Sequence, residues 1–218
     1  PLVVGAQEHE RRVGALLDGY DDVVRPSAVD EIGFTVEDWG ILRAPYQRAH
    51  FSTAVSAASL WMGRGLDPEL VAQAISRVRW PGRLQKLVAR VGGQDVEFLL
   101  DAAHNPDGST MLFDLLDHIG FQPGLVLCGA MKDKVLRELF APLDEQRCPV
   151  FGVLIENERA ADEVLLREHL PEDARVGTIS EAFAFLKDVA AEPSQLQKPS
   201  VLRVLVFGSI YLLGELLG

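Results

Sequence analysis

The sequence predicts an α/β protein built on a mostly parallel sheet with helices on both faces. Two observations support this prediction: apolar strand-like runs alternate with helical patterns, and the loops between them are short. A hairpin, 84–91 and 96–101, is expected before this alternation, because Gly92-Gly93 is a typical hairpin turn. The elements expected after it are helix 107–119, strand 124–129, helix 133–140, strand 149–155, helix 162–170, strand 175–179, helix 181–191 and strand 201–207.

Residues 1–79 are expected to form a domain of their own. A Pro/Gly break at 79–82 predicts the boundary, so the second domain is expected at 80–218. The chain starts directly on an apolar strand without Met, and we therefore expect it to be part of a longer polypeptide. The elements expected before the boundary are strand 2–6, helix 8–20, short strands or loop at 23–45, helix 50–62 and helix 67–78.

Composition limits the class of protein. A hydrophobic content of 48% and a charged content of 24% are ordinary for a soluble globular protein. The net charge of -11 argues against a general nucleic-acid surface. No run of eighteen apolar residues and no signal-peptide pattern occurs, so we expect a cytoplasmic protein without a membrane partner. Cys128 and Cys148 show no metal-ligand spacing and are expected to be buried thiols.

The stretch around residues 101–106 is the strongest candidate for chemistry. An apolar strand ends at Asp101, and Asn105-Pro106 then suits the start of a helix. Asp101 is an acceptor suited to sugar hydroxyls, whereas His104 precedes free helix N–H groups that favour an anion. The alternative is that Asp101 and Asn105 only satisfy backbone groups at the turn. The buried face of the following helix is expected to comprise Met111, Leu112, Leu115, Leu116 and Ile119.

An acidic chain must capture an anionic ligand locally. The cations placed near loops for this purpose are Arg83, Lys132, Lys134 and Arg159. Ser209 follows Gly208 at the end of the last strand, where its hydroxyl could reach a ligand carboxylate or cap the next helix. Tyr211, Leu212 and Leu213 are expected in the core.

Four motifs resemble the dihydrofolate synthase/folylpolyglutamate synthase family of the Mur ligase superfamily. They are Trp80-Pro-Gly-Arg-Leu-Gln85, Asp101-Ala-Ala-His-Asn-Pro106, Gly129-Ala-Met-Lys-Asp-Lys134 and Gly208-Ser-Ile-Tyr-Leu-Leu-Gly-Glu215. The resemblance implies a Rossmann-like C-terminal domain at 80–218, preceded at 1–79 by the end of the central ATP-binding domain.

The resemblance also implies roles for single residues. Arg83 and Asp101 would contact the nucleotide, and His50 stands where the family has an adenine-binding Asn. His104 and Ser209 would act on glutamate in catalysis. Asn105, Lys134 and Arg159 would lie on the substrate side; here Val135 replaces an Asp that follows the lysine in the family.

The implied activity is an ATP-dependent amide ligase that adds glutamate to folate, and that also makes dihydrofolate from dihydropteroate in some members. ATP and Mg²⁺ would be bound mainly by an N-terminal domain, and the protein would be a monomer. No phosphate-binding Gly-Lys-Ser/Thr loop occurs in these 218 residues, so we expect the chain alone to be inactive. Two alternatives stay open: part of a cell-wall Mur ligase, or a non-catalytic module that binds nucleotide or glutamate.

Overall fold

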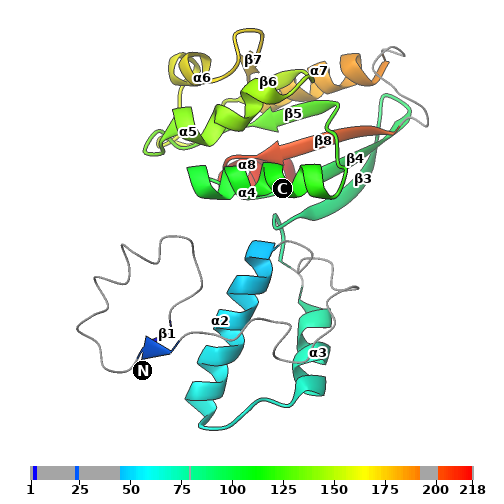
Figure 1. Ribbon diagram of the computed structural model, residues 1–218. Helices are drawn as coiled ribbons and strands as arrows, with labels where there is room; N and C mark the ends of the chain where they lie inside the picture. Colours follow the sequence, from blue (N-terminus) through cyan, green and yellow to red (C-terminus); the bar gives the residue numbers. More distant parts are fainter. Residues whose placement is uncertain (1, 4–22, 25–44, 79, 192–200, 218) are drawn as a thin grey trace. The chain divides into compact units, whose positions relative to one another are not determined.

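The computed structural model describes residues 2–3, 23–24, 45–78, 80–191 and 201–217 (Figure 1). The chain divides into two compact units, 1–79 and 80–218, and each is described by itself. The helix expected at 8–20 lies outside the described residues. What these units correspond to in a longer protein stays a prediction.

Two helices and a strand pair make up the described part of the first unit. β1 (Leu2–Val3) pairs in parallel with β2 (Val23–Val24). α2 (Pro45–Met62) begins five residues before the expected helix, because Pro45 suits the first helical position. α3 (Pro68–Arg77) is capped by Asp67, whose Oδ1 accepts the Glu69 N–H at 2.9 Å.

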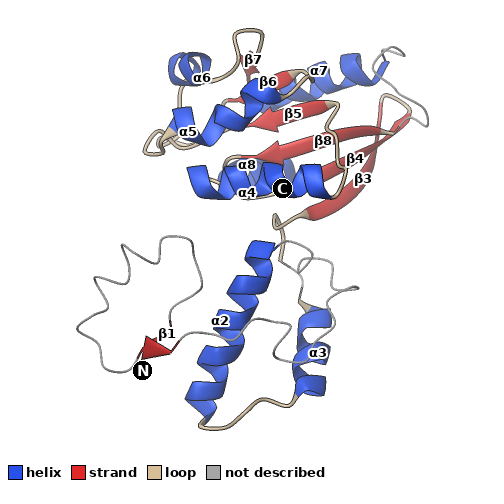
Figure 2. Cartoon of the chain, viewed as in Figure 1, coloured by secondary structure: helices blue, strands red, loops and turns tan. Residues whose placement is uncertain are grey.

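A six-stranded sheet forms the centre of the second unit (Figure 2). Its strand order is β3-β4-β8-β5-β6-β7, with β3 antiparallel to β4 and all the other neighbours parallel. The predicted mostly parallel sheet is therefore confirmed. The strands are β3 (Gln85–Val91), β4 (Gln94–Leu100), β5 (Leu125–Cys128), β6 (Val150–Val153), β7 (Arg175–Gly177) and β8 (Leu202–Phe207).

Helices cover both faces of this sheet, as predicted. Successive residues of a buried strand point to opposite faces, so Val126 and Cys128 join one core cluster, whereas Leu125 and Leu127 join the other. The first cluster lies under α4 (Pro106–His118), α5 (Leu136–Phe140), the 3₁₀ helix η3 (Ala141–Glu145) and α6 (Glu163–His169). The second lies under α7 (Ile179–Ala191) and α8 (Ile210–Leu217).

Several sequence expectations for side chains and helix ends were wrong. Met111 and Ile119 are exposed at the border of the buried face of α4, and Tyr211 is exposed whereas Leu212 and Leu213 are buried. Cys128 is buried, but Cys148 is only half-buried. α5 starts at Leu136 instead of residue 133, because the preceding backbone pairs with another loop through an isolated bridge, Met131 to Ala160. No helix in the described ranges is long and apolar enough to cross a membrane.

Candidate functional site

Five segments that carry the sequence motifs meet at one edge of the sheet. The parallel strands β4, β8, β5 and β6 are neighbours, and their registers align Leu100 with Val206, and Cys128 with both Phe207 and Gly152. Because β3 is antiparallel to β4, its first residue, Gln85, lies beside Leu100. We call this place the carboxyl edge; it comprises segments 80–84, 101–105, 129–134, 154–160 and 208–209. Ligands of open α/β sheets bind at such an edge.

The buried Asp101 carboxylate joins the 80–84 loop to the end of β4. Its Oδ2 accepts the Leu84 N–H at 3.0 Å, and its Oδ1 accepts the Ala103 N–H at 2.8 Å. The carbonyl of Gly82 accepts the Ala102 N–H at 2.7 Å and adds a third link. Asp101 is 1% exposed, so in this state its carboxylate serves backbone groups. The same loop carries Arg83, which is half-buried.

His104 and Asn105 lie at the start of α4. His104 Nδ1 lies 2.9 Å from the carbonyl oxygen of Ala102, which can only accept, so Nδ1 carries a proton and Nε2 is left for a ligand. The imidazole is exposed. Asn105 Oδ1 accepts the Gly108 N–H at 2.7 Å, which is an N-cap contact. The hydrogen bonds of Asp101 and Asn105 thus fit the alternative in which these side chains only satisfy backbone groups at the turn. His104 differs, because its Nε2 can contact a ligand.

Gly208 and Ser209 form the tight turn between β8 and α8. Gly208 has a φ of 107°, and a Cβ atom there would lie 2.5 Å from the carbonyl oxygen of Gly129, so no side chain fits. Ser209 Oγ accepts the Tyr211 N–H at 3.1 Å, as an N-cap does. Ser209 is 3% exposed, and this contact leaves its hydroxyl proton free to be donated.

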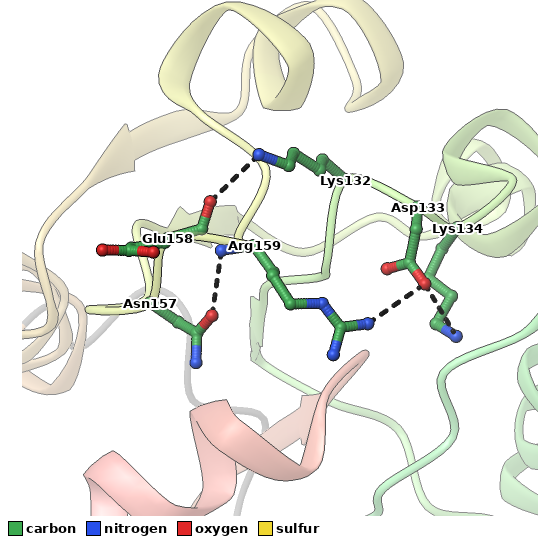
Figure 3. Close-up of polar contacts among 6 residues, drawn as sticks. All are labelled: Lys132, Asp133, Lys134, Asn157, Glu158 and Arg159. Carbon is green, nitrogen blue, oxygen red and sulfur yellow. Dashed lines mark hydrogen bonds and ion pairs between the residues drawn. The ribbon is translucent and has the colours of Figure 1, made fainter.

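The loops after β5 and β6 lie side by side and gather three cations (Figure 3). Arg159 Nη2 and Lys134 Nζ lie 3.3 and 3.7 Å from the same oxygen, Oδ2 of Asp133. Lys132 Nζ donates to the Glu158 carbonyl at 3.0 Å, and its backbone N–H donates to the Arg159 carbonyl at 2.8 Å. We call Lys132, Asp133, Lys134 and Arg159 the basic cluster.

The structure brings some of the predicted site residues into contact and leaves others apart. Lys134 and Arg159 both contact Asp133. No role was predicted for Asp133, although its position between two lysines indicates an ion pair. Glu215 was also missed; its contact with the loop after β6 spans 59 residues, which no local pattern shows. His50 lies exposed on α2 in the first unit, and its contact with adenine stays a prediction.

Metal ligands were expected outside this chain. In the part of the chain that the structure describes, no three His, Cys, Asp or Glu side chains are placed to hold a metal ion. The candidate site therefore offers cations, helix N–H groups and hydroxyls, which suit anions such as phosphates and carboxylates.

Comparison with models of protein families gives no match. Among curated proteins, the chain is 28% identical over 187 residues to the probable bifunctional folylpolyglutamate synthase/dihydropteroate synthase of Halobacterium salinarum, covering 84% of this chain and 22% of that protein. It is 29% identical over 92 residues to the folylpolyglutamate synthase of Lacticaseibacillus casei, covering 41% and 20%. It is also 29% identical over 122 residues to the UDP-N-acetylmuramoyl-L-alanyl-D-glutamate--2,6-diaminopimelate ligase of Syntrophomonas wolfei, covering 54% and 24%.

Solved structures show the same fold. The folylpolyglutamate synthase of Mycobacterium tuberculosis complexed with ADP matches with a TM-score of 0.63 and 24% identity, over 79% of this chain and 39% of that one. The bifunctional folylpolyglutamate synthase/dihydrofolate synthase of Yersinia pestis complexed with AMPPNP and a Mn ion matches with a TM-score of 0.59 and 24% identity, over 80% and 38%.

The second unit, with its carboxyl edge, has an α/β fold like that of these solved ligase structures. Within this fold class, the chain is similar to the C-terminal part of the dihydrofolate synthase/folylpolyglutamate synthase family, and the resemblance predicted from the motifs is confirmed. The chain spans less than a quarter of the length of the curated relatives named above.

Proposed function

We propose that this chain is the C-terminal part of a cytoplasmic, ATP-dependent ligase that adds glutamate to a folate. One observation carries the proposal: motifs spread over 130 residues of sequence converge on the carboxyl edge of one parallel sheet. In the reaction, an oxygen of the folate carboxylate attacks the terminal phosphorus of ATP and ADP leaves. The glutamate amine then attacks the acyl phosphate, expels phosphate and loses a proton.

Arg83 is the nucleotide contact in this proposal. Its half-buried side chain forms no hydrogen bond or ion pair with other described residues, so its guanidinium is available for phosphate oxygens. Asp101 acts first through the loop, because it holds the Leu84 N–H next to Arg83. A direct contact of Asp101 with ribose hydroxyls, as the resemblance implies, would be made by the same carboxylate oxygens that accept the Leu84 and Ala103 N–H groups.

His104, Asn105 and Ser209 are proposed to handle glutamate. His104 presents Nε2, which as an imidazolium donates to a carboxylate, and Ser209 retains a hydroxyl proton for the same purpose. Asn105 sets the start of α4, whose N–H groups favour a negative charge beside His104. The basic cluster supplies Lys134 and Arg159 for carboxylates on the substrate side.

A Mur ligase of the cell wall is the second candidate. The similarity to the diaminopimelate ligase of Syntrophomonas wolfei favours it, because its identity over 122 residues equals that to the Lacticaseibacillus casei enzyme. Both candidates form an amide through an acyl phosphate, and they differ in the carboxylate that is activated and in the amino acid that is added.

A ligase assay tests the proposal. The 218-residue chain and the full-length protein of its gene would each be given ATP, Mg²⁺ and either dihydropteroate and folate with glutamate, or muramyl-peptide precursors with diaminopimelate. We expect ADP and a glutamylated folate from the full-length protein, and neither from the chain alone. Turnover with muramyl precursors would support the Mur ligase, and binding of ADP or glutamate without turnover in any combination would support the non-catalytic module.

A further inference from the structure

Glu215 on α8 makes a long-range contact with the loop after β6. Its Oε1 accepts the Glu156 N–H at 2.6 Å, a short charge-assisted hydrogen bond between residues 59 positions apart. Glu156 is the second residue after Leu154, which follows the end of β6, and it opens the loop that carries Arg159. Glu215 is therefore the side chain that joins the last helix to this loop.

The second oxygen of Glu215 makes this carboxylate unusual. Among the described residues, Glu215 Oε2 is the buried side-chain oxygen or nitrogen that has no hydrogen-bond partner. A buried unpaired acceptor costs free energy, which an apolar side chain would avoid only by leaving the Glu156 N–H without this acceptor. The contribution of this carboxylate therefore lies in the bond of Oε1 to the loop, which is made although Oε2 stays unpaired.

The loop transmits the position of Glu156 to the basic cluster through short contacts. Asn157 accepts the Arg159 N–H on Oδ1 at 2.9 Å and the Ala160 N–H on its carbonyl at 2.9 Å, which closes a tight turn. The Arg159 carbonyl then accepts the Lys132 N–H at 2.8 Å. Arg159 in turn lies against Asp133 (Figure 3), and because this turn is compact, a shift of its first residue would move Arg159 relative to Asp133.

We propose that Glu215 is a positioning residue: it fixes the 156–160 loop so that Arg159 presents its charge to a carboxylate of the substrate glutamate in one geometry. The identity of this ligand as glutamate rests on the proposed function. Glu215 itself does not touch the substrate. It acts by limiting the conformations of the loop, so that less entropy is lost when a carboxylate binds.

Amide hydrogen exchange on the 218-residue chain tests the positioning directly. Glu215→Ala removes the acceptor, and we expect the Glu156 amide to exchange at least tenfold faster, with protection of the β8 amides unchanged. Glu215→Gln keeps an acceptor oxygen and should stay within about threefold of the wild type. Glu158→Ala is the matched control, because Glu158 belongs to the same loop and contributes its backbone carbonyl, but its side chain forms no hydrogen bond or ion pair with the residues that the structure describes. If Glu215→Ala does not fold, Glu215→Leu fills the buried volume without an acceptor.

An NMR titration with L-glutamate tests whether the fixed loop strengthens glutamate binding at Arg159. In the wild type, the Arg159 Nε–H and the 157–160 amides should shift and saturate; Glu215→Ala should weaken the affinity at least fivefold, and Glu215→Gln and Glu158→Ala less than twofold. Unchanged exchange at Glu156 in Glu215→Ala would overturn the inference, as would faster exchange with unchanged glutamate affinity. If the wild type binds no glutamate at Arg159, the proposed role of the basic cluster fails instead, and exchange alone decides whether Glu215 fixes the loop.

Discussion

The Asp101 carboxylate holds the backbone of Leu84 in a conformation that few leucines adopt. Leu84 has a φ of 47°, and its N–H donates to Asp101 Oδ2 at 3.0 Å. A left-handed conformation costs a residue with a side chain about 1–2 kcal/mol. The hydrogen bond and the packing of Leu84 against the core offset this cost, and they give the loop that carries Arg83 a defined shape.

Asp101→Ala should therefore destabilise the second unit. Two backbone N–H groups lose their acceptor, and we expect the free energy of unfolding to fall by about 1–3 kcal/mol, measured by urea denaturation. Asp101→Asn keeps one acceptor oxygen and should lose less. Asp114→Ala, at an exposed position of α4, should change the value by less than about 0.5 kcal/mol. Equal stability of Asp101→Ala and the wild type would contradict the structural role of this carboxylate.

Two glycines near the last helix should respond in opposite directions to alanine. Gly208→Ala places a Cβ against the Gly129 carbonyl oxygen at a φ of 107°, so we expect a loss of about 1–3 kcal/mol or more. Gly214 lies within α8, where a Cβ would meet nothing within 4 Å. Gly214→Ala should raise stability by about 0.5–1 kcal/mol. Thermal unfolding followed by circular dichroism measures both, and a shift of the same sign in both variants would be inconsistent with the geometry.

The start of α7 should give the protein an acid-sensitive contribution to stability. Glu181 Oε2 accepts the Thr178 N–H at 2.7 Å and the Thr178 hydroxyl at 2.9 Å, and these bonds hold the pKa of Glu181 below its usual value near 4.5. Because the folded pKa is the lower one, the contribution is fully present above about pH 4.5 and is lost as the pH falls through the folded pKa. Glu181→Gln should remove this part of the pH dependence of the urea midpoint, whereas Glu168→Gln on α6 should retain it.

The two thiols should differ in reactivity. Burial raises the pKa of the Cys148 thiol to about 11, against a smaller opposing effect of a backbone hydrogen bond, and burial raises that of Cys128 further still. Since the thiolate is the reactive form, alkylation of Cys148 by iodoacetamide should rise about tenfold per pH unit from 7 to 9 without levelling. Cys128 should react only as the protein unfolds. Mass spectrometry of Cys148→Ser and Cys128→Ala variants separates the two rates, and a plateau for Cys148 below pH 9 would contradict the raised pKa.

The central strands β5, β6 and β8 were predictable because they are apolar runs, as the residues at 201–207 are, whereas β3 was predictable from the Gly92-Gly93 turn. The start of α5 was not predictable, because Met131 and Asp133 contact a loop that lies 26 to 29 positions later in the sequence. The contacts between residues of the candidate site were not predictable either, for the same reason. Arg159 and Asp133 meet because β5 and β6 are neighbours, and the Asp101 and Asp133 segments are separated by β8, the last strand in the chain. Motif spacing along the chain carries no information on this strand order.

The antiparallel direction of β3 places a tryptophan, Trp80, in a loop at the carboxyl edge, where its fluorescence can report on a bound ligand. Because β3 starts at the carboxyl edge, the 80–84 loop before it also lies there, and its first residue, Trp80, is 62% exposed and three residues before Arg83. The chain has three tryptophans, and the other two, Trp39 and Trp61, precede the boundary at Arg79. Replacing those two with Phe would leave one tryptophan, whose emission wavelength and quenching by iodide would follow the occupation of this edge without an attached dye.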